Sequence, residues 1–335
     1  MEEELRNLIK VCISVLISIS YCYYISSKIS KGFLRLISLL PIFIIFLLIP
    51  LFLSSVHFCA ISAFFLTWLA NFKLLLFAFD QEPLSPLPSS FSRFLCFTCF
   101  PIKHQQNPRS LTHFPKWLFI IKVVIFIVVL HVYHNFKQYL PSILLLGFYP
   151  LNLYLEHEMI LTPLKYMVTL TLGLDLQPQF NEPYLATSLQ DFWGRRWNLM
   201  VSDILRSSVY TPVRKICQHF VNTEWAMIIG VLATFIASGV LHELLYVYLT
   251  REMHTGEVTW FFVLHGVCTM VEVLGKKKTF VGRQPVRPIV SQFLTVGFVS
   301  LTSGWLFFPQ LIRSNVIENF VYEASLFLDF FKLNF

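Results

Sequence analysis

Residues 226–249 read AMIIGVLATFIASGVLHELLYVYL, and this stretch decides the fold. Its 24 residues can cross a hydrocarbon core of about 30 Å, because an α-helix rises about 1.5 Å per residue. His242 lies 16 residues after Ala226, about 24 Å along the helix axis, at or beyond the midplane. Ionisable side chains at such depth are costly, about 2.5–3.5 kcal/mol for Asp, Lys or Arg on insertion scales, and indicate function by default.

Two interpretations of His242 remain open from this stretch alone. Ser238 and Gly239 precede it by four and three residues, so all three share one helix face. In the first interpretation, His242 is a hydrogen-bonded histidine between helices, and the two small residues let those helices pack closely. In the second, His242 is a catalytic base that faces a buried cavity, and the small residues leave room for a substrate.

The composition indicates an all-α, polytopic transmembrane helical bundle. Of the 335 residues, 56% are apolar and only 13% are charged, against about 25% charged in a typical soluble domain. The net charge of +7 fits cytoplasmic loops of a membrane protein better than nucleic-acid binding. Glu2, Glu3 and Glu4 stand where a signal peptide has basic residues, and no small-residue cleavage site follows, so we expect the first apolar run to be retained as a membrane helix.

The apolar runs predict about eight to nine spans in one integral membrane domain, residues 1–335. The runs are 11–27, 36–53, 54–72, 117–134, 141–155, 160–174, 226–249, 258–274 and 288–312, and the tail is a further candidate. The runs at 141–155 and 160–174 are short, so one of them is expected to be re-entrant or interfacial. Basic residues place segment 28–35, the Pro-rich loop 73–116 and segment 275–288 in the cytoplasm, and the same alternation places the polar motif region 175–224 there. The prolines of loop 73–116 exclude a long helix. Lys122, near the start of its span, is expected to snorkel.

A second stretch, LQDFWGRRWNLM at 189–200, gathers aromatic, basic and amide side chains. Trp193 and Trp197 are four residues apart and would share one face of a helix. Arg195 and Arg196 carry fixed positive charges that suit phosphate groups. The alternative is an interfacial aromatic belt with snorkelling arginines, but this alternative does not explain Asp191 or Asn198.

These two stretches together resemble the membrane-bound O-acyltransferase superfamily. FWGRRWN at 192–198 is followed 44 residues later by the membrane-embedded His242 of ASGVLHE, most similar to the plant wax synthase family (long-chain-alcohol O-fatty-acyltransferases) and its sterol acyltransferase relatives. The stretch WLANFKLLLFAF at 68–79, with Pro83-Leu-Ser85 after it, is similar to the N-terminal half of that family. The resemblance implies acyl-CoA as co-substrate without a bound cofactor, and it maps the catalytic histidine and asparagine onto His242 and Asn198. Diacylglycerol and sterol acyltransferases usually carry paired tryptophans before that asparagine, where this chain has Arg195-Arg196-Trp197, which leaves open which residue grips CoA.

The chemistry of ester formation suits these residue types. An alcohol is a weak nucleophile at neutral pH, so a base must accept its proton, and burial keeps a histidine in the neutral form that can do so. The resulting oxyanion can be stabilised by the Asn198 amide or by a backbone N–H. The substrate-binding candidates around this pair are Trp193, Arg195, Arg196, Trp197, Ser238 and Gly239. Glu243 points about 100° away from His242 on the helix, so we expect a different helix to orient the imidazole.

Other motifs are weaker candidates for chemistry, and no metal site is predicted. Cys96-Phe-Thr-Cys99 is a single pair, whereas a closed zinc site needs four ligands. The sequence HELLY at 242–246 lacks the second histidine of a zinc protease. His131 and His134 are interpreted as interfacial, and Glu156-His-Glu158 as solvated at the end of a span. Lys276-Lys-Lys278 is interpreted as a topology determinant.

The sequence therefore predicts a multi-pass enzyme of the endoplasmic reticulum membrane that makes a wax ester from acyl-CoA and a long-chain alcohol. Its expected partners are these two substrates and membrane lipid, without nucleic acid, and a monomer or a homo-oligomer is compatible with the chain. One alternative is a sterol O-acyltransferase. Another, from a different class, is a non-enzymatic transporter or channel in which His242 and Glu243 form a proton or ion path.

Overall fold

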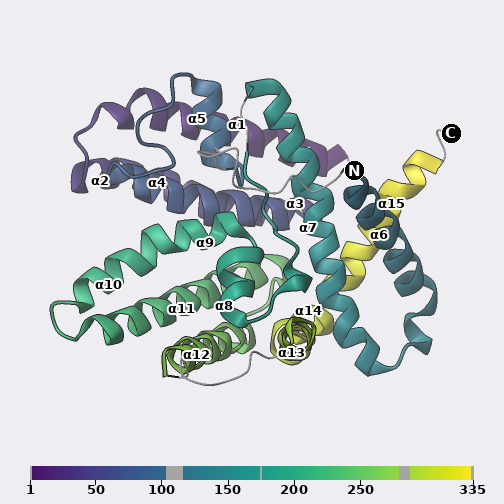
Figure 1. The fold of residues 1–335 in the computed structure, drawn as a ribbon. Helices are drawn as coiled ribbons and strands as arrows, with labels where there is room; N and C mark the ends of the chain where they lie inside the picture. The colour runs from purple at the N-terminus through teal and green to yellow at the C-terminus, as the bar shows by residue number, and fades with distance from the viewer. Residues whose placement is uncertain (1, 103–115, 174–175, 279–286, 333–335) are drawn as a thin grey trace.

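The computed structural model describes residues 2–102, 116–173, 176–278 and 287–332, and its regular elements are helices (Figure 1). The α-helices are α1 (Glu2–Tyr24), α2 (Phe33–Leu48), α3 (Val56–Ser62), α4 (Asn71–Ala78), α5 (Phe91–Cys99), α6 (Lys116–Phe136), α7 (Ser142–Leu172), α8 (Leu189–Asp191), α9 (Leu199–Leu205), α10 (Thr211–Cys217), α11 (Thr223–Thr250), α12 (Glu257–Lys278), α13 (Pro288–Thr302), α14 (Pro309–Arg313) and α15 (Val316–Lys332). Four π-helical segments interrupt them: η3 (Ala63–Ala70), η6 (Phe192–Arg196), η7 (Arg206–Tyr210) and η8 (Ser303–Phe307).

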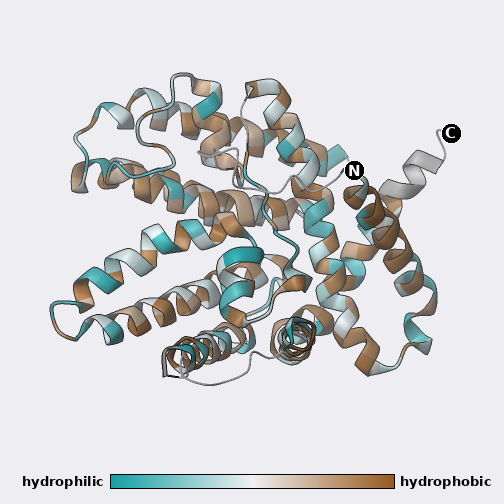
Figure 2. Ribbon diagram, in the orientation of Figure 1, coloured by the Kyte–Doolittle hydropathy of each residue, from teal (hydrophilic) through white to brown (hydrophobic). Residues whose placement is uncertain are grey.

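Seven helical segments of the described chain are long and apolar enough to cross a membrane. They are Glu2–Lys28, Phe33–Phe52, Val56–Ala78, Trp117–Tyr139, Thr223–Thr250, Glu257–Lys276 and Pro288–Phe307. The predicted class, an all-α multi-pass membrane bundle, is confirmed, although eight to nine spans were expected. Figure 2 shows apolar residues along most of these helices, and large apolar side chains such as Phe293 and Leu170 are exposed, as lipid-facing positions require.

The expected pair of short spans at 141–155 and 160–174 is wrong. Residues 142–172 form one helix, α7, of 31 residues that continues through Pro150 and Pro163. The helix carries Glu156 and Glu158 near its middle, which lowers its hydropathy although it is long enough to span. A membrane helix can keep proline where neighbouring groups compensate for the lost backbone hydrogen bond.

Lys122 and Glu158 are also placed differently from the prediction. The Lys122 ammonium does not snorkel, because its Nζ lies 2.9 Å from Glu158 Oε1 and 3.1 Å from Glu182 Oε1 in the interior. Glu158 in turn accepts hydrogen bonds from Tyr154 Oη at 2.9 Å and from a threonine hydroxyl one turn later. This buried cluster joins α6 and α7 to the segment that leads into the FWGRRWN motif.

The run α3–η3–α4 is the most buried of the seven spans, with 67% of its apolar window inside the protein. The sequence predicts that Lys73 begins the cytoplasmic loop, but in the structure Lys73 lies within α4. Its Nζ is fully buried and donates to the carbonyl oxygens of Phe97 (2.7 Å) and Phe100 (2.6 Å), which fastens α4 to α5. The Pro-rich loop therefore begins after Ala78 and contains the short helix α5, and its remainder at 103–115 lies outside the described residues.

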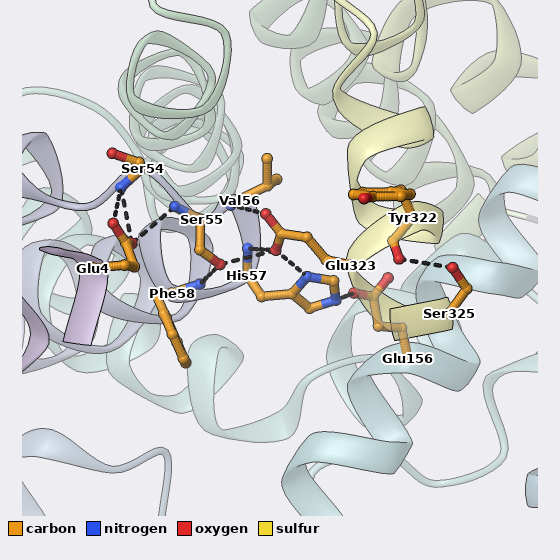
Figure 3. A network of polar contacts seen from close by, with 10 residues as sticks. All are labelled: Glu4, Ser54, Ser55, Val56, His57, Phe58, Glu156, Tyr322, Glu323 and Ser325. Atoms are coloured by element: carbon orange, nitrogen blue, oxygen red, sulfur yellow. Dashed lines mark hydrogen bonds and ion pairs between the residues drawn. The ribbon is translucent and has the colours of Figure 1, made fainter. Parts of the chain in front are cut away.

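The C-terminal helix α15 is attached to the start of α3 through Glu323 (Figure 3). The Glu323 carboxylate accepts from the backbone N–H groups of Val56 (2.9 Å) and His57 (3.1 Å), and from Ser55 Oγ (2.8 Å). His57 lies between two carboxylates, with Nδ1 at 2.7 Å from Glu323 and Nε2 at 3.2 Å from Glu156. Burial raises the pKa of Glu323, but the hydrogen bonds outweigh this effect and lower that pKa to about 2.

Candidate active site

A cavity of about 830 Å³ lies among these helices, within the range of about 300–1,000 Å³ that is usual for ligand sites. Its walls come from α3, α7, α9, α10, α11, α12 and α13, and from the motif segment. Each of the four π-helical segments contributes to it, with Trp68 from η3, Trp193 from η6, Arg206 from η7 and Phe307 from η8. A π-helical turn shifts the side chains that follow it around the helix, and such turns are frequent at functional sites.

His242 faces this cavity from α11 and is held in one tautomer. Its Nδ1 lies 2.7 Å from the carbonyl oxygen of Ser238, which can only accept, so Nδ1 carries the proton and Nε2 keeps its lone pair. The ring lies edge-on to Trp68 at 5.1 Å between centroids and tilted against Phe262 at 4.4 Å. The orienting acceptor therefore comes from α11 itself, and the expectation that another helix supplies it is wrong.

Asn198 lines the same cavity from a strained backbone position. Its φ of +40° lies in the left-handed region, where Asn is tolerated better than most residues. As N-cap of α9, its Oδ1 accepts from the backbone N–H of Val201 at 3.4 Å. Because this N–H must face the oxygen, the Asn198 NH₂ points the other way and keeps its two donors for a different acceptor.

The FWGRRWN stretch does not form a regular helix with Trp193 and Trp197 on one face. Residues 192–196 are π-helical, and Trp197 follows in an extended conformation with its ring stacked on Phe192 at 5.5 Å. Both tryptophans nevertheless line the cavity, so the geometry brings them together with Asn198.

The two arginines of this stretch lie outside the cavity lining. The Arg196 Nε donates to Asp191 at 2.7 Å, and its Nη1 reaches the carbonyl oxygens of Asn181 and Glu182, so Arg196 ties the motif loop together. Arg195 is exposed. The prediction that these arginines form part of the substrate site has no support from their positions.

Ser238 and Gly239 take different roles. Ser238 lines the cavity, and its carbonyl orients His242. Gly239 does not line it: a Cβ at this position would lie 2.9 Å from the Cα of Thr259, so Gly239 permits the close contact of α11 with α12. Glu243 also faces α12, where Oε1 accepts from the Thr259 backbone N–H at 3.2 Å.

Residues 176–264, which contain both Asn198 and His242, match the model of the membrane bound O-acyl transferase family. Three proteins of Arabidopsis thaliana are similar over almost the whole length of both chains. Probable long-chain-alcohol O-fatty-acyltransferase 3 is 60% identical over 100% of this chain and 98% of its own length. Probable long-chain-alcohol O-fatty-acyltransferase 9 is 56% identical over 100% of this chain and 99% of its own length. Probable long-chain-alcohol O-fatty-acyltransferase 7 is 54% identical over 99% of this chain and 98% of its own length.

The chain belongs to the membrane-bound O-acyltransferase family. This confirms the resemblance that the two motifs indicated, and the protein is an acyltransferase. The transporter alternative is therefore set aside.

Several residues that line the cavity of this acyltransferase were not predicted from the sequence. His157 lines the cavity from α7, with Nδ1 at 2.8 Å from the Leu153 carbonyl, the same local arrangement as in His242. His157 was expected to be solvated together with Glu156 and Glu158, because the three residues lie at the end of a predicted span. The one signal in the sequence for a buried His157 is that it lies within a long, mostly apolar helical run, as His242 does.

Two further arginines line the cavity, Arg206 from η7 and Arg214 from α10. The Arg214 guanidinium lies 6.0 Å from the Tyr210 ring centroid, and its Nε is buried without a hydrogen-bond partner in the described structure. These residues lie in the polar region 175–224, but nothing in the sequence distinguishes them from its other basic residues. Among the described residues, no three His, Cys, Asp or Glu side chains lie together as metal ligands would, and Cys96 and Cys99 are free thiols.

Proposed function

We propose that this acyltransferase moves a fatty acyl group from acyl-CoA to a long-chain alcohol and forms a wax ester, with His242 as general base. The observation that carries the proposal is the tautomer of His242. Its Nδ1–H is held by the Ser238 carbonyl, so Nε2 is left as a proton acceptor inside the cavity. A neutral imidazole in an apolar site is the form that general-base catalysis requires.

The reaction balances within this set of residues. The alcohol O–H bond breaks as its proton moves to His242 Nε2, and the oxygen attacks the thioester carbonyl carbon. The carbonyl oxygen becomes an oxyanion, which the NH₂ of Asn198 would stabilise, because this amide lines the cavity and its oxygen is already engaged as a helix cap. The C–S bond then breaks, and the thiolate takes the proton from His242 Nε2, which returns the imidazole to its neutral form.

The acyl donor is proposed to be acyl-CoA because of the arginines at the cavity wall. CoA carries phosphate groups, and guanidinium groups bind phosphates through paired hydrogen bonds. Arg206 and Arg214 line the cavity, and the buried Nε of Arg214 lacks a partner that a phosphate oxygen would supply. We assign the phosphate contacts to these two residues and no longer to Arg195 and Arg196.

The acceptor is proposed from the similar proteins together with the cavity lining. The names of those proteins specify long-chain alcohols, and the cavity of this chain is lined mainly by aromatic and aliphatic side chains such as Phe262, Met270 and Val299. Such a lining suits an alkyl chain that enters from the bilayer. We also propose the endoplasmic reticulum membrane as the location, which co-localisation of a tagged chain with a marker of that membrane would test.

Microsomes from a yeast strain without its own neutral-lipid acyltransferases, expressing this chain, test the proposal with labelled acyl-CoA and a panel of alcohols and sterols. Wax ester from a long-chain alcohol is the expected product. Sterol ester alone would replace the acceptor, and no ester from any acceptor would refute the proposal. Arg214→Gln should raise the KM for acyl-CoA, whereas Lys215→Gln, its exposed neighbour, should not. An unchanged KM in Arg214→Gln would remove this residue from the donor site.

A further inference from the structure

Trp193 is held by two hydrogen bonds that come from different helices. The indole Nε1–H donates to His265 Nδ1 on α12 at 3.1 Å, and the Trp193 carbonyl accepts from Ser202 Oγ on α9 at 2.7 Å. Ser202 lies one turn after Asn198, so the second bond ties Trp193 to the helix that Asn198 caps. Trp193 therefore connects α9, the helix that Asn198 caps, to α12.

The direction of the first bond fixes the state of His265. An indole N–H can only donate, so His265 Nδ1 must be unprotonated and Nε2 must carry the proton. This Nε2–H donates to Thr302 Oγ1 at 2.8 Å, and the Thr302 hydroxyl donates to the Phe298 carbonyl at 2.7 Å. The chain is complete, because every donor in it meets an acceptor, and a doubly protonated His265 would break its first bond. His265 is fully buried and does not line the cavity.

The same chain reaches the surroundings of His242. Thr302 ends α13 immediately before η8, whose Phe307 ring lies 5.7 Å from the His242 ring. On the other side, the Trp193 ring contacts Phe262 at 5.8 Å, and Phe262 packs on His242 at 4.4 Å. Three cavity walls therefore meet through His265: the motif segment, α12 and the junction of α13 with η8.

We infer that His265 is a positioning residue for acyl transfer, which through Trp193 sets the placement of Asn198 relative to His242. The inference rests on the proposed function for its kinetic part. Since the Trp193 N–H is already bonded to His265, this tryptophan offers the substrate its ring and not its donor. Loss of the bond frees the indole, and a displacement of about 1 Å in a catalytic group can cost about 10²-fold in rate.

Four variants test the inference: His265→Leu, His265→Asn, Trp193→Phe, and Trp193→Phe combined with His265→Leu. His265→Leu should lower kcat by up to about 10²-fold with little change in the KM for acyl-CoA, because the alignment of the reacting groups is lost and donor binding is not. His265→Asn should restore much of kcat, since its Oδ1 can replace Nδ1 as acceptor. The double variant should be no slower than Trp193→Phe, because His265 acts through that ring.

The results that would overturn the inference are distinct. Additive losses in the double variant, or equal losses in His265→Asn and His265→Leu, would make His265 a packing residue only, and so would losses that follow the melting temperature in detergent. The indole N–H signal of Trp193, taken as the ultraviolet resonance Raman difference between wild type and Trp193→Phe, needs no turnover. It should show a bonded N–H that is lost in His265→Leu. A free N–H in the wild type would refute the inference even if ester is formed, and an inactive wild type would refute the proposed function instead.

Discussion

Substitution of Asn198 separates its two roles, because the structure assigns its oxygen to the fold and its NH₂ to the chemistry. Asn198→Ala puts alanine at φ +40°, in the left-handed region that alanine tolerates less well than asparagine, and removes the side-chain oxygen that caps α9. The left-handed conformation costs about 1–2 kcal/mol and the lost cap about 0.5–2 kcal/mol, so this variant should be destabilised by about 1.5–4 kcal/mol. Asn198→Gly accepts the same φ and, as a cap, costs only a few tenths of a kcal/mol. Asn198→Asp keeps the cap oxygen and loses both donors.

All three variants should lose turnover by about 10²–10³-fold, the range for removal of one oxyanion donor. Only Asn198→Ala should also unfold at a clearly lower temperature. The assay is ester formation in yeast microsomes, normalised to protein level, with thermal unfolding of each variant in detergent. If Asn198→Gly or Asn198→Asp turned over as fast as wild type, Asn198 would be a helix cap alone and the oxyanion role would be refuted.

Three other predictions concern the scaffold. Gly239→Ala should destabilise the fold by about 1–3 kcal/mol, because its Cβ meets backbone of α12 at 2.9 Å, whereas Gly297→Ala, with open space around it, should not; equal melting temperatures would contradict the close packing of α11 on α12. Lys122→Met should cost about 3–5 kcal/mol by leaving two buried carboxylates unpaired, and a melting temperature equal to that of the wild type would show that the cluster is solvated. The pKa of Glu323 is lowered in the folded state, so its stabilising effect is present above about 4.5 and is lost as the pH falls towards about 2. Acid unfolding followed by circular dichroism should show this loss in the wild type and not in Glu323→Gln; the same acid profile in both would disconnect Glu323 from acid stability.

The class of fold was predictable from the sequence because it depends on local patterns of apolar residues. The apolar length of 226–249 defines α11, and the depth of His242 in it follows from the helical rise alone. Asn198 and His242 were paired by resemblance to a family and not by geometry, and the structure places both in one cavity.

One physical cause of the errors is that partners from distant elements decide where a charged residue lies. Lys73 and Lys122 are charged, but both are bound in the interior. The carbonyl oxygens of Phe97 and Phe100 bind Lys73. One carboxylate from α7 and one from the segment before the FWGRRWN motif bind Lys122. Arg196 is similar, since its partners Asp191 and Asn181 close a loop that no periodicity describes. The π-helical segments are a second cause, because a rule of four residues per turn misplaces the faces of Trp193 and Trp197.

The central claim is that His242 takes the proton of the acceptor alcohol, and the turnover of His242→Gln tests it most directly. Glutamine keeps a polar side chain of similar size but cannot act as a base near neutral pH. At equal protein level, ester formation should fall by about 10²–10⁴-fold, the usual contribution of a general base, while His134→Gln, an exposed histidine on α6, should retain wild-type turnover. Wild-type turnover in His242→Gln would contradict the account.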